Sequence, residues 1–232
     1  MKKILSFLIK KTIIYLDILI HRKRIRKFLN NTELKISTIF DVGSNNGDYS
    51  LLFNKIYPGV KIFAFEPNPY LFKIAKKNTK NFKNIKIVQR AVGNSNSLTK
   101  LKIDQNSSLT TSLAIKNKDS NTYKIKKFLY GKKNGETTKI KLIKLDSFIK
   151  KNKSPDFIKI DVEGFEEEVL KGLKNNLKTI KLVMIEFHFD KLYKKYNTRR
   201  LHSFLIKNNF KHIKSIKFPV LNWEDRFYKN NY

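Results

Sequence analysis

The sequence of 232 residues contains no cysteine, only eight glycines, five prolines and one tryptophan. The lack of cysteine excludes a disulfide framework, a cysteine metal site and a cysteine nucleophile, and it agrees with a cytoplasmic protein. Acidic residues are also few, since 19 Asp and Glu stand against 50 Lys and Arg, which gives a formal net charge of +31. Such a charge attracts nucleic acid, anionic lipid or acidic polysaccharide. Because the Lys residues are spread along the chain, composition alone does not select a partner.

No apolar run among the first thirty residues is long enough to span a bilayer. Residues 4–9 are apolar, but Lys10 and Lys11 follow them without a small-residue cleavage site, so we do not expect a signal peptide. Residues 12–20 contain Asp17 and lead into a basic run. This pattern predicts an amphipathic helix.

The predicted organisation is a helical extension over residues 1–34 and one domain over residues 35–232, because this length suits a single α/β domain with modest additions. Two roles remain open for residues 1–30. The helix either packs on the domain or lies on an anionic membrane with its basic residues toward the headgroups. We therefore expect a cytoplasmic protein, with membrane association as the open alternative.

Strand-like and helix-like patterns alternate from residue 38 onward, which predicts an α/β fold with a mostly parallel sheet. Strands are expected at 38–42, 61–65, 85–92, 156–162 and 182–188. Helices are expected at 48–56, 70–78, 165–173 and 199–208. Two further pairs of segments predict antiparallel strands, an inserted pair at 98–104 and 139–145 and a closing pair at 211–218 and 226–229.

The first two predicted strands end in residues suited to a nucleoside. Gly43 and Gly47 remove side chains where backbone approaches a ligand and turns into a helix. Glu66 ends the next strand, where a carboxylate can accept hydrogen bonds from both hydroxyls of a ribose. Asp41 places a further carboxylate where it would repel a phosphate. A cationic nucleoside without phosphate, such as S-adenosylmethionine, therefore fits better than a dinucleotide.

A third strand end is acidic as well. Asp161 ends the strand at 156–162, and ligands of doubly wound sheets bind beyond the carboxyl ends of the strands. We therefore expect Asp41, Glu66 and Asp161 around one pocket. The following strand brings Glu186 and His188 to the same rim.

Three motifs in this order, DVGSNNG at 41–47, FEPNP at 65–69 and KIDVEGFE at 159–166, resemble the FkbM family of S-adenosylmethionine-dependent methyltransferases. The resemblance extends over about residues 39–187. It implies a Rossmann-like class I methyltransferase fold, a seven-stranded sheet with one antiparallel strand, and methyl transfer to a hydroxyl of a sugar, glycan or other polyol. Asn46 departs from the hydrophobic residue that the family often has there, whereas the glycines and acids match.

The strand ends and this resemblance together predict a set of residues that bind the cofactor: Asp41, Gly43, Asn45, Gly47, Glu66, Pro67, Asn68, Ala91 and Asp161. Ala91 falls where class I methyltransferases contact the adenine. An acid that often bonds the adenine amino group is missing there, so we expect contacts from backbone or from Gln89.

Methyl transfer to an alcohol requires in-line geometry and a base that takes the hydroxyl proton. Asp161, Glu163, Glu186 and His188 are the candidates. His188 has the most suitable intrinsic pKa, whereas Asp161 is best placed by the family motif. Our hypothesis is that Asp161 orients or deprotonates the acceptor and His188 assists, with Glu163 as a third catalytic candidate. We predict no metal, because strand-end carboxylates without fixed ligand spacing are weak evidence for one.

The segment 105–138 is rich in Ser, Thr, Asn and Lys. Long segments of this kind within a domain often bind ligands. We assign it to acceptor recognition through five hydroxyl side chains, and a solvated loop is the alternative. The five are Ser107, Ser108, Thr110, Thr111 and Ser112.

Two other functions remain open. An RNA methyltransferase would make use of the positive charge, but no Asn-Pro-Pro-Tyr or Asp-Pro-Pro-Tyr motif follows the fourth strand, so we expect no specific nucleic acid. A non-catalytic membrane or glycan-binding module on the same fold is the second alternative. Intact Gly43 and Glu66 favour an enzyme with a small-molecule or glycan acceptor.

Overall fold

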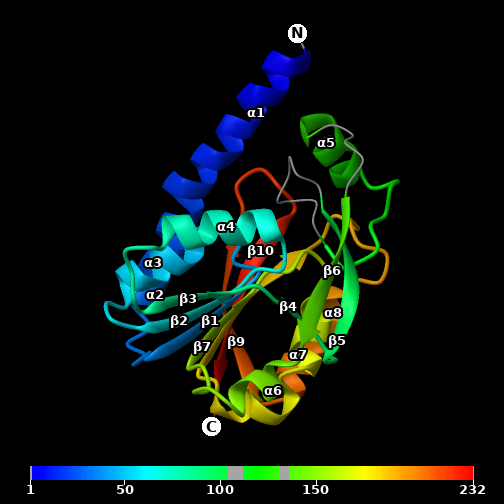
Figure 1. Cartoon of the computed structure of the whole chain (residues 1–232). Helices are drawn as coiled ribbons and strands as arrows, with labels where there is room; N and C mark the ends of the chain where they lie inside the picture. The colour runs from blue at the N-terminus through cyan, green and yellow to red at the C-terminus, as the bar shows by residue number, and fades with distance from the viewer. Residues whose placement is uncertain (1, 104–111, 131–135, 232) are drawn as a thin grey trace.

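The centre of the computed structural model is a seven-stranded sheet. The model describes residues 2–103, 112–130 and 136–231. The strands are β1 (Thr38–Val42), β2 (Lys61–Phe65), β3 (Ile85–Val88), β7 (Phe157–Ile160), β8 (Leu182–His188), β9 (Phe210–Lys217) and β10 (Trp223–Asn230). Their order is β3-β2-β1-β7-β8-β10-β9 (Figure 1). Only β10 runs antiparallel to its neighbours, β8 and β9, which confirms the predicted sheet.

Helices cover both faces of this sheet because its strands alternate apolar side chains toward two cores. The helices are α3 (Asp48–Ile56), α4 (Pro69–Asn78), α6 (Leu145–Ile149), α7 (Glu166–Lys171), the 3₁₀ helix η3 (Lys174–Thr179) and α8 (Thr198–Lys207). Phe40 of β1 faces the core that α6, α7 and α8 close, whereas Ile39 faces the core that contains Phe53 of α3. Because β1, β2, β7 and β8 are parallel, their carboxyl ends share one edge of the sheet.

A second, three-stranded sheet lies beside the first. Its strands are β4 (Ala91–Val92), β5 (Ser97–Ile103) and β6 (Glu136–Ile143), in the order β4-β6-β5. The antiparallel pairing of β5 with β6 confirms the predicted inserted pair. The prediction of one strand over 85–92 is wrong, because the backbone turns where the Arg90 N–H donates to the Val88 carbonyl. The chain thereby leaves the main sheet and continues in the second one.

A helix that the sequence patterns did not predict, α5 (Asn121–Tyr130), lies within the segment assigned to acceptor recognition. Of the five hydroxyl residues proposed there, Ser112 is described, and its Oγ donates to the Glu163 carbonyl at 2.6 Å. Ser107, Ser108, Thr110 and Thr111 lie outside the described residues.

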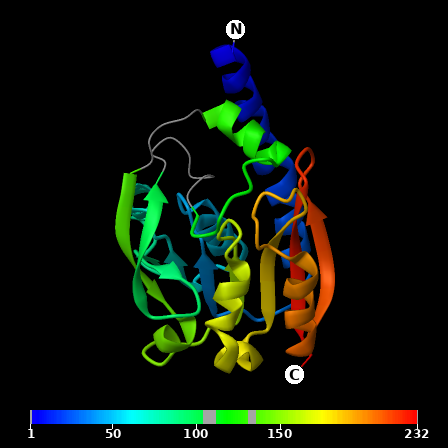
Figure 2. The ribbon, with the colours of Figure 1, turned by 90° about the vertical axis from the view of Figure 1, so that its right-hand side faces the viewer.

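The N-terminal segment is helical over residues 2–30. It consists of α1 (Lys2–Leu16), the π-helical turn η1 (Asp17–His21) and α2 (Arg22–Asn30). Ile25 and Leu29 anchor α2 in the core beside α3, whereas α1 leads away from the sheet and has α5 beside it (Figures 1 and 2). The proposed division at residue 34 stays a prediction. Within the described residues, no helix has the length and apolar character needed to cross a membrane.

The π-helical turn is held by a buried polar contact. The His21 side chain is fully buried against the stacked rings of Phe218 and Trp223, and its Nε2 lies 2.7 Å from Oδ2 of Asp225 on β10. This contact ties the base of the N-terminal helix to the antiparallel strand of the main sheet.

Candidate active site

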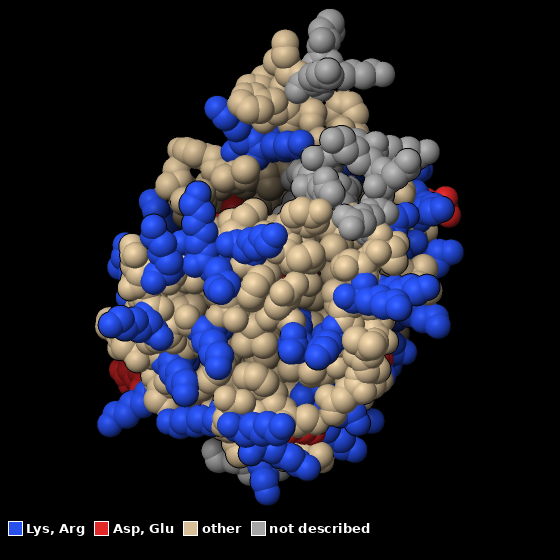
Figure 3. Space-filling view, in the orientation of Figure 1, with Lys and Arg blue, Asp and Glu red and all other residues tan. Residues whose placement is uncertain are grey.

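A cavity of about 510 Å³ opens at the carboxyl ends of β1, β2, β7 and β8. Its floor contains the β1 loop, Glu66 and Asp161, and apolar side chains of α1, η1 and α5 form its roof. The roof residues include Ile13, Ile18, Ile125 and Leu129. Figure 3 shows a hollow on this face below the N-terminal helix, with Lys and Arg side chains around it.

The loop after β1 depends on glycine. Gly43 has a φ of +80°, and a Cβ there would lie 1.8 Å from the carbonyl oxygen of Asp161, so no other residue fits. Gly47 has a φ of +87° and precedes α3 as its N-cap, but it does not line the cavity. Asn45, with a φ of +53°, does line it. The loop thus contributes the residues from Gly43 to Asn46 to the cavity wall.

Glu66 lies at the cavity wall and is held by the backbone. Its Oε2 accepts from the Asn45 N–H at 2.9 Å and its Oε1 accepts from the Asn68 N–H at 2.8 Å. Burial outweighs these hydrogen bonds and raises the pKa of Glu66 to about 7. Pro67 also lines the cavity, whereas the Asn68 side chain lies outside it and caps α4 by accepting from the Tyr70 N–H.

Asp41 does not lie in the cavity wall, contrary to the expectation that it faces the ligand. Its side chain points beneath the loop, where Oδ2 accepts from the Ser50 hydroxyl at 2.6 Å and Oδ1 lies 3.5 Å from Nζ of Lys159. The reason is the alternation of a strand, which turns Asp41 to the face that carries α3. Asp41 therefore contacts Lys159, which in turn contacts Asp161 in the cavity wall.

Lys159 is the residue whose role the motifs did not predict. It is 2% exposed, and its Nζ lies 3.1 Å from Oδ2 of Asp161 and donates to the Gly43 carbonyl at 3.0 Å. Although burial opposes its charge, Asp161 and Asp41 raise its pKa above the ordinary value. A lysine among the buried residues of β7 was the available signal, because a buried lysine requires an acidic partner.

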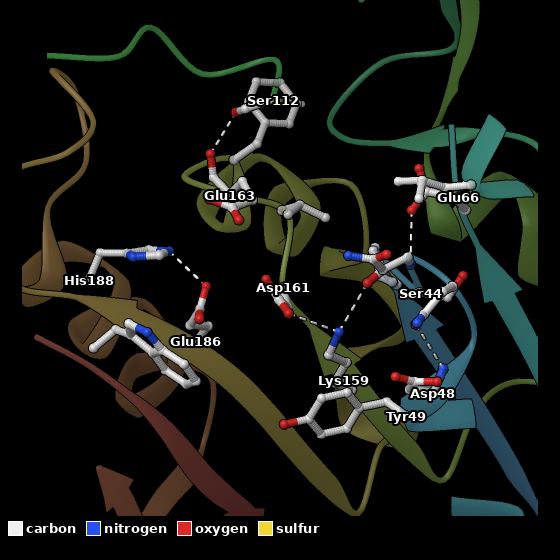
Figure 4. A pocket seen from close by; sticks show the side chains of 18 of the residues that line it. Ser44, Asp48, Tyr49, Glu66, Ser112, Lys159, Asp161, Glu163, Glu186 and His188 are labelled. Atoms are coloured by element: carbon white, nitrogen blue, oxygen red, sulfur yellow. Dashed lines mark hydrogen bonds and ion pairs between the residues drawn. The ribbon is translucent and has the colours of Figure 1, made fainter. Parts of the chain in front are cut away.

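Asp161 lines the cavity between two groups of side chains (Figure 4). Burial disfavours its charge, but the Lys159 ammonium outweighs that effect and lowers the pKa of Asp161. On one side lies Glu66, and on the other Glu186 and His188 turn toward each other, with Oε2 and Nε2 2.8 Å apart. Burial opposes the charge of His188, yet Glu186 raises the pKa of His188 to about 10.

Glu163 reaches the cavity from a strained turn. Its φ is +56°, and the next residue, Gly164, has a φ of +93°. The Glu163 carboxylate accepts from Tyr193 and lies 3.1 Å from Nζ of Lys126 on α5. Glu163 therefore connects the carboxyl edge of the sheet with the roof.

The structure thus brings six of the nine predicted cofactor residues to one cavity, together with all three catalytic candidates. The cofactor candidates in its wall are Gly43, Asn45, Glu66, Pro67, Ala91 and Asp161, and the catalytic ones are Asp161, Glu163 and His188. The other three lie outside the wall: Asp41 beneath the β1 loop, Gly47 within that loop, and Asn68 at the start of α4. The roles of all these residues stay predictions.

The strand order and the site at the carboxyl edge define a Rossmann-like methyltransferase fold, as two solved structures show. The chain superposes on a putative rRNA methylase from Clostridium thermocellum with a TM-score of 0.53 at 7% identity, covering 90% of this chain and 94% of that one. An rRNA methylase from Streptococcus thermophilus gives a TM-score of 0.52 at 8% identity, with 92% and 98% covered. At such identities the likeness shows the fold alone.

The chain belongs to the FkbM methyltransferase domain family, whose model matches residues 41–216. This match confirms the predicted family and, with it, S-adenosylmethionine as the expected methyl donor. The chain is also 30% identical over 166 residues to the hexuronic acid methyltransferase AglP of Haloferax volcanii. That alignment covers 71% of this chain and 61% of the relative, so it spans less than two thirds of that protein.

Proposed function

We propose that this protein is an S-adenosylmethionine-dependent methyltransferase that methylates a hydroxyl group of a sugar or glycan. The observation that carries the proposal is one cavity that joins the Gly43 loop and Glu66 to the Asp161–Lys159 pair. The family supports the class of reaction, and the hexuronic acid methyltransferase supports a sugar acceptor.

Glu66 would hold the ribose of the donor. Each of its carboxylate oxygens accepts one backbone N–H and retains a lone pair for a ribose hydroxyl. Ala91 and Arg90 line the cavity near β4, where the adenine would lie. When bound, S-adenosylmethionine supplies an electrophilic methyl group, and its sulfur takes the electron pair of the broken C–S bond.

Asp161 would orient the acceptor hydroxyl and accept its proton as the new C–O bond forms. The Lys159 ammonium keeps Asp161 ionised, which is the form that accepts a proton. With a pKa of about 10, His188 is protonated near neutral pH in the absence of other ligands. It therefore assists by holding Glu186 rather than by taking the proton itself.

The surroundings of the cavity favour an acidic acceptor. Within the wall, Arg22 is paired with Asp17 and Asp48, and Lys126 with Glu163, so the attraction comes from outside it. There the excess of 31 positive charges covers much of the surface (Figure 3). Such a field increases the encounter rate with anionic molecules. A sugar that carries a carboxylate, such as a hexuronic acid, is therefore the first acceptor class to test.

The test is methyl transfer from radiolabelled S-adenosylmethionine to glucuronate-containing oligosaccharides, with total RNA as the competing acceptor. We expect label in the oligosaccharide, and label in RNA alone would favour the RNA methyltransferase. Asp161→Asn should abolish turnover while S-adenosylmethionine still raises the melting temperature. Glu33→Gln, on the exposed surface and outside the cavity wall, is the matched control. Stabilisation by NAD alone would contradict the assignment.

We also propose that α1 contacts an anionic membrane, because it exposes large apolar side chains beside basic ones. Ile4, Phe7 and Leu8 are 66%, 54% and 54% exposed, and Lys10 and Lys11 follow them in the sequence. An apolar helix surface with adjacent lysines is typical of interfacial helices.

Co-sedimentation with vesicles tests this contact. We expect the protein to sediment with phosphatidylglycerol vesicles and much less with phosphatidylcholine vesicles. The double variant Phe7→Glu, Leu8→Glu should lose the binding, whereas Leu98→Glu, on an exposed residue of β5, should retain it. Equal binding of both variants would contradict the role of α1.

A further inference from the structure

Three buried side chains behind the catalytic edge lie close enough to bind one metal ion. Glu166, Glu186 and His188 each offer a ligand atom, and these atoms lie within 4.8 Å of one another. The atoms of one coordination shell lie about 3–4 Å apart when each is about 2.1 Å from the ion, so small side-chain rotations would close the shell.

Glu166 is the residue that points to a ligand. Its side chain is fully buried, and Oε1 accepts from the N–H groups of Val162 and Gly164, each at 3.1 Å. These hydrogen bonds fix the carboxylate, yet Oε2 has no hydrogen-bond partner among the described residues. A buried carboxylate oxygen without a partner is costly unless a cation compensates it.

His188 is also prepared for a ligand. Its ring is held edge-on by Tyr193 and Tyr196, at centroid distances of 5.0 Å and 5.5 Å. Nδ1 has no hydrogen-bond partner among the described residues, and Nε2 lies 2.8 Å from Oε2 of Glu186, as an ion pair. Because the two tyrosines fix the ring, little side-chain entropy is lost when one of its nitrogens binds a ligand.

In contrast to the expectation from the sequence that no metal binds, we propose that Glu166, Glu186 and His188 bind a divalent first-row metal ion beside the acceptor pocket. Two carboxylates with one imidazole suit ions such as Mn²⁺ or Zn²⁺, which accept both oxygen and nitrogen ligands. Glu186 and His188 line the cavity whereas Glu166 lies behind them, so the open coordination positions face the acceptor.

The role of this ion rests on the proposed methyl transfer. A metal-bound hydroxyl has a lowered pKa, and Asp161 would remove its proton more readily. The ion would also select acceptors that offer adjacent oxygens, as a sugar does. The binding of the ion itself does not depend on that function.

An imidazolium between the two carboxylates is the competing arrangement, because a proton on His188 compensates the same charges. In that arrangement no metal binds, since the proton and the metal need the same nitrogen. The two arrangements therefore differ in a measurable stoichiometry.

The experiment is a titration of the full chain with Mn²⁺ after dialysis against EDTA, followed by calorimetry and by electron paramagnetic resonance. We expect one Mn²⁺ per chain with a nitrogen coupling from imidazole in the pulsed spectrum. Glu166→Gln should weaken binding at least about tenfold, because the uncharged amide is a much poorer ligand. Glu168→Gln, on the same helix but paired with Lys171, is the matched control and should bind as the wild type does.

No binding by the wild type, or equal binding by Glu166→Gln, would overturn the metal site. If Glu166→Gln fails to fold, the nitrogen coupling of the wild type and its loss in His188→Gln decide the question. A thermal shift with S-adenosylmethionine on the same samples separates the two proposals. Donor binding without metal binding rejects this inference alone, and metal binding without donor binding rejects the proposed function.

Discussion

Gly43 is the glycine at which a side chain would meet the closest backbone contact. Gly59 has nearly the same φ, +78° against +80°, but a Cβ on Gly59 would meet nothing within 4 Å. The two glycines therefore separate the effect of backbone strain from that of the contact with Asp161.

We predict that Gly59→Ala costs about 1 kcal/mol of unfolding free energy, through its left-handed backbone alone. Gly43→Ala should cost at least about 2 kcal/mol more, because its Cβ overlaps the Asp161 carbonyl. It should also abolish S-adenosylmethionine binding. Urea unfolding of both variants measures the difference, and equal losses would show that the overlap relaxes freely.

We predict that Glu66 makes the affinity for S-adenosylmethionine dependent on pH. Only the ionised carboxylate accepts hydrogen bonds from both ribose hydroxyls, and burial raises the pKa of Glu66 to about 7. The ionised fraction is about nine tenths at pH 8 and about one tenth at pH 6. We therefore predict roughly tenfold weaker S-adenosylmethionine binding at pH 6 than at pH 8.

Calorimetric titration at both pH values measures this effect. Glu66→Gln should bind the donor weakly at both and lose the pH dependence, because its amide does not titrate in this range. An unchanged pH dependence in Glu66→Gln would assign the effect to another group.

At the scale of elements, β1 and β7 are connected by an ion pair as well as by backbone hydrogen bonds. Their register places Asp41 opposite Lys159, so the lysine lies between Asp41 and Asp161 at the edge of the site. Removing only the cation leaves the buried Asp41 and the partly buried Asp161 without their common partner.

We predict that Lys159→Met lowers the unfolding free energy by about 3–5 kcal/mol. Lys181→Met is the control, since Lys181 is about half exposed and its pair with Asp156 contributes at most about 1 kcal/mol. Urea unfolding compares the two variants. A loss in Lys159→Met no larger than in Lys181→Met would mean that water replaces the ammonium.

The same elements show which parts of the fold could be predicted from the sequence. Apolar runs and glycines predicted β1, β2, β8 and α3 within a residue or two, because these signals are local. The register that pairs Asp41 with Lys159 is a long-range property, so the sequence placed Asp41 in the pocket wall. The turn at Glu163 and Gly164 is likewise not predictable from local patterns, and it places Glu166 where its Oε1 accepts from the Gly164 N–H.

At the scale of the whole molecule, the motifs were sufficient for the family and for the carboxyl edge of the sheet as the site. The motifs did not predict the roof of the cavity, which α1, η1 and α5 form. α5 has no clear periodicity of its own, and it gains its place by packing beside α1, as shown by the Ser6 hydroxyl that donates to the Leu129 carbonyl at 2.8 Å. Tertiary packing therefore determines the part of the cavity that a local pattern does not predict.

The roof has a consequence for how such proteins diverge. The family match begins at residue 41, whereas Ile13, Asp17 and Ile18 of the cavity wall precede it. The part of the roof that α1 and η1 contribute therefore lies outside the matched region, whereas α5 and the floor of the cavity lie within it. Exchange of the leading helices between relatives would reshape the entrance and leave the donor end intact, so new acceptors could be acquired without the methyl source being lost.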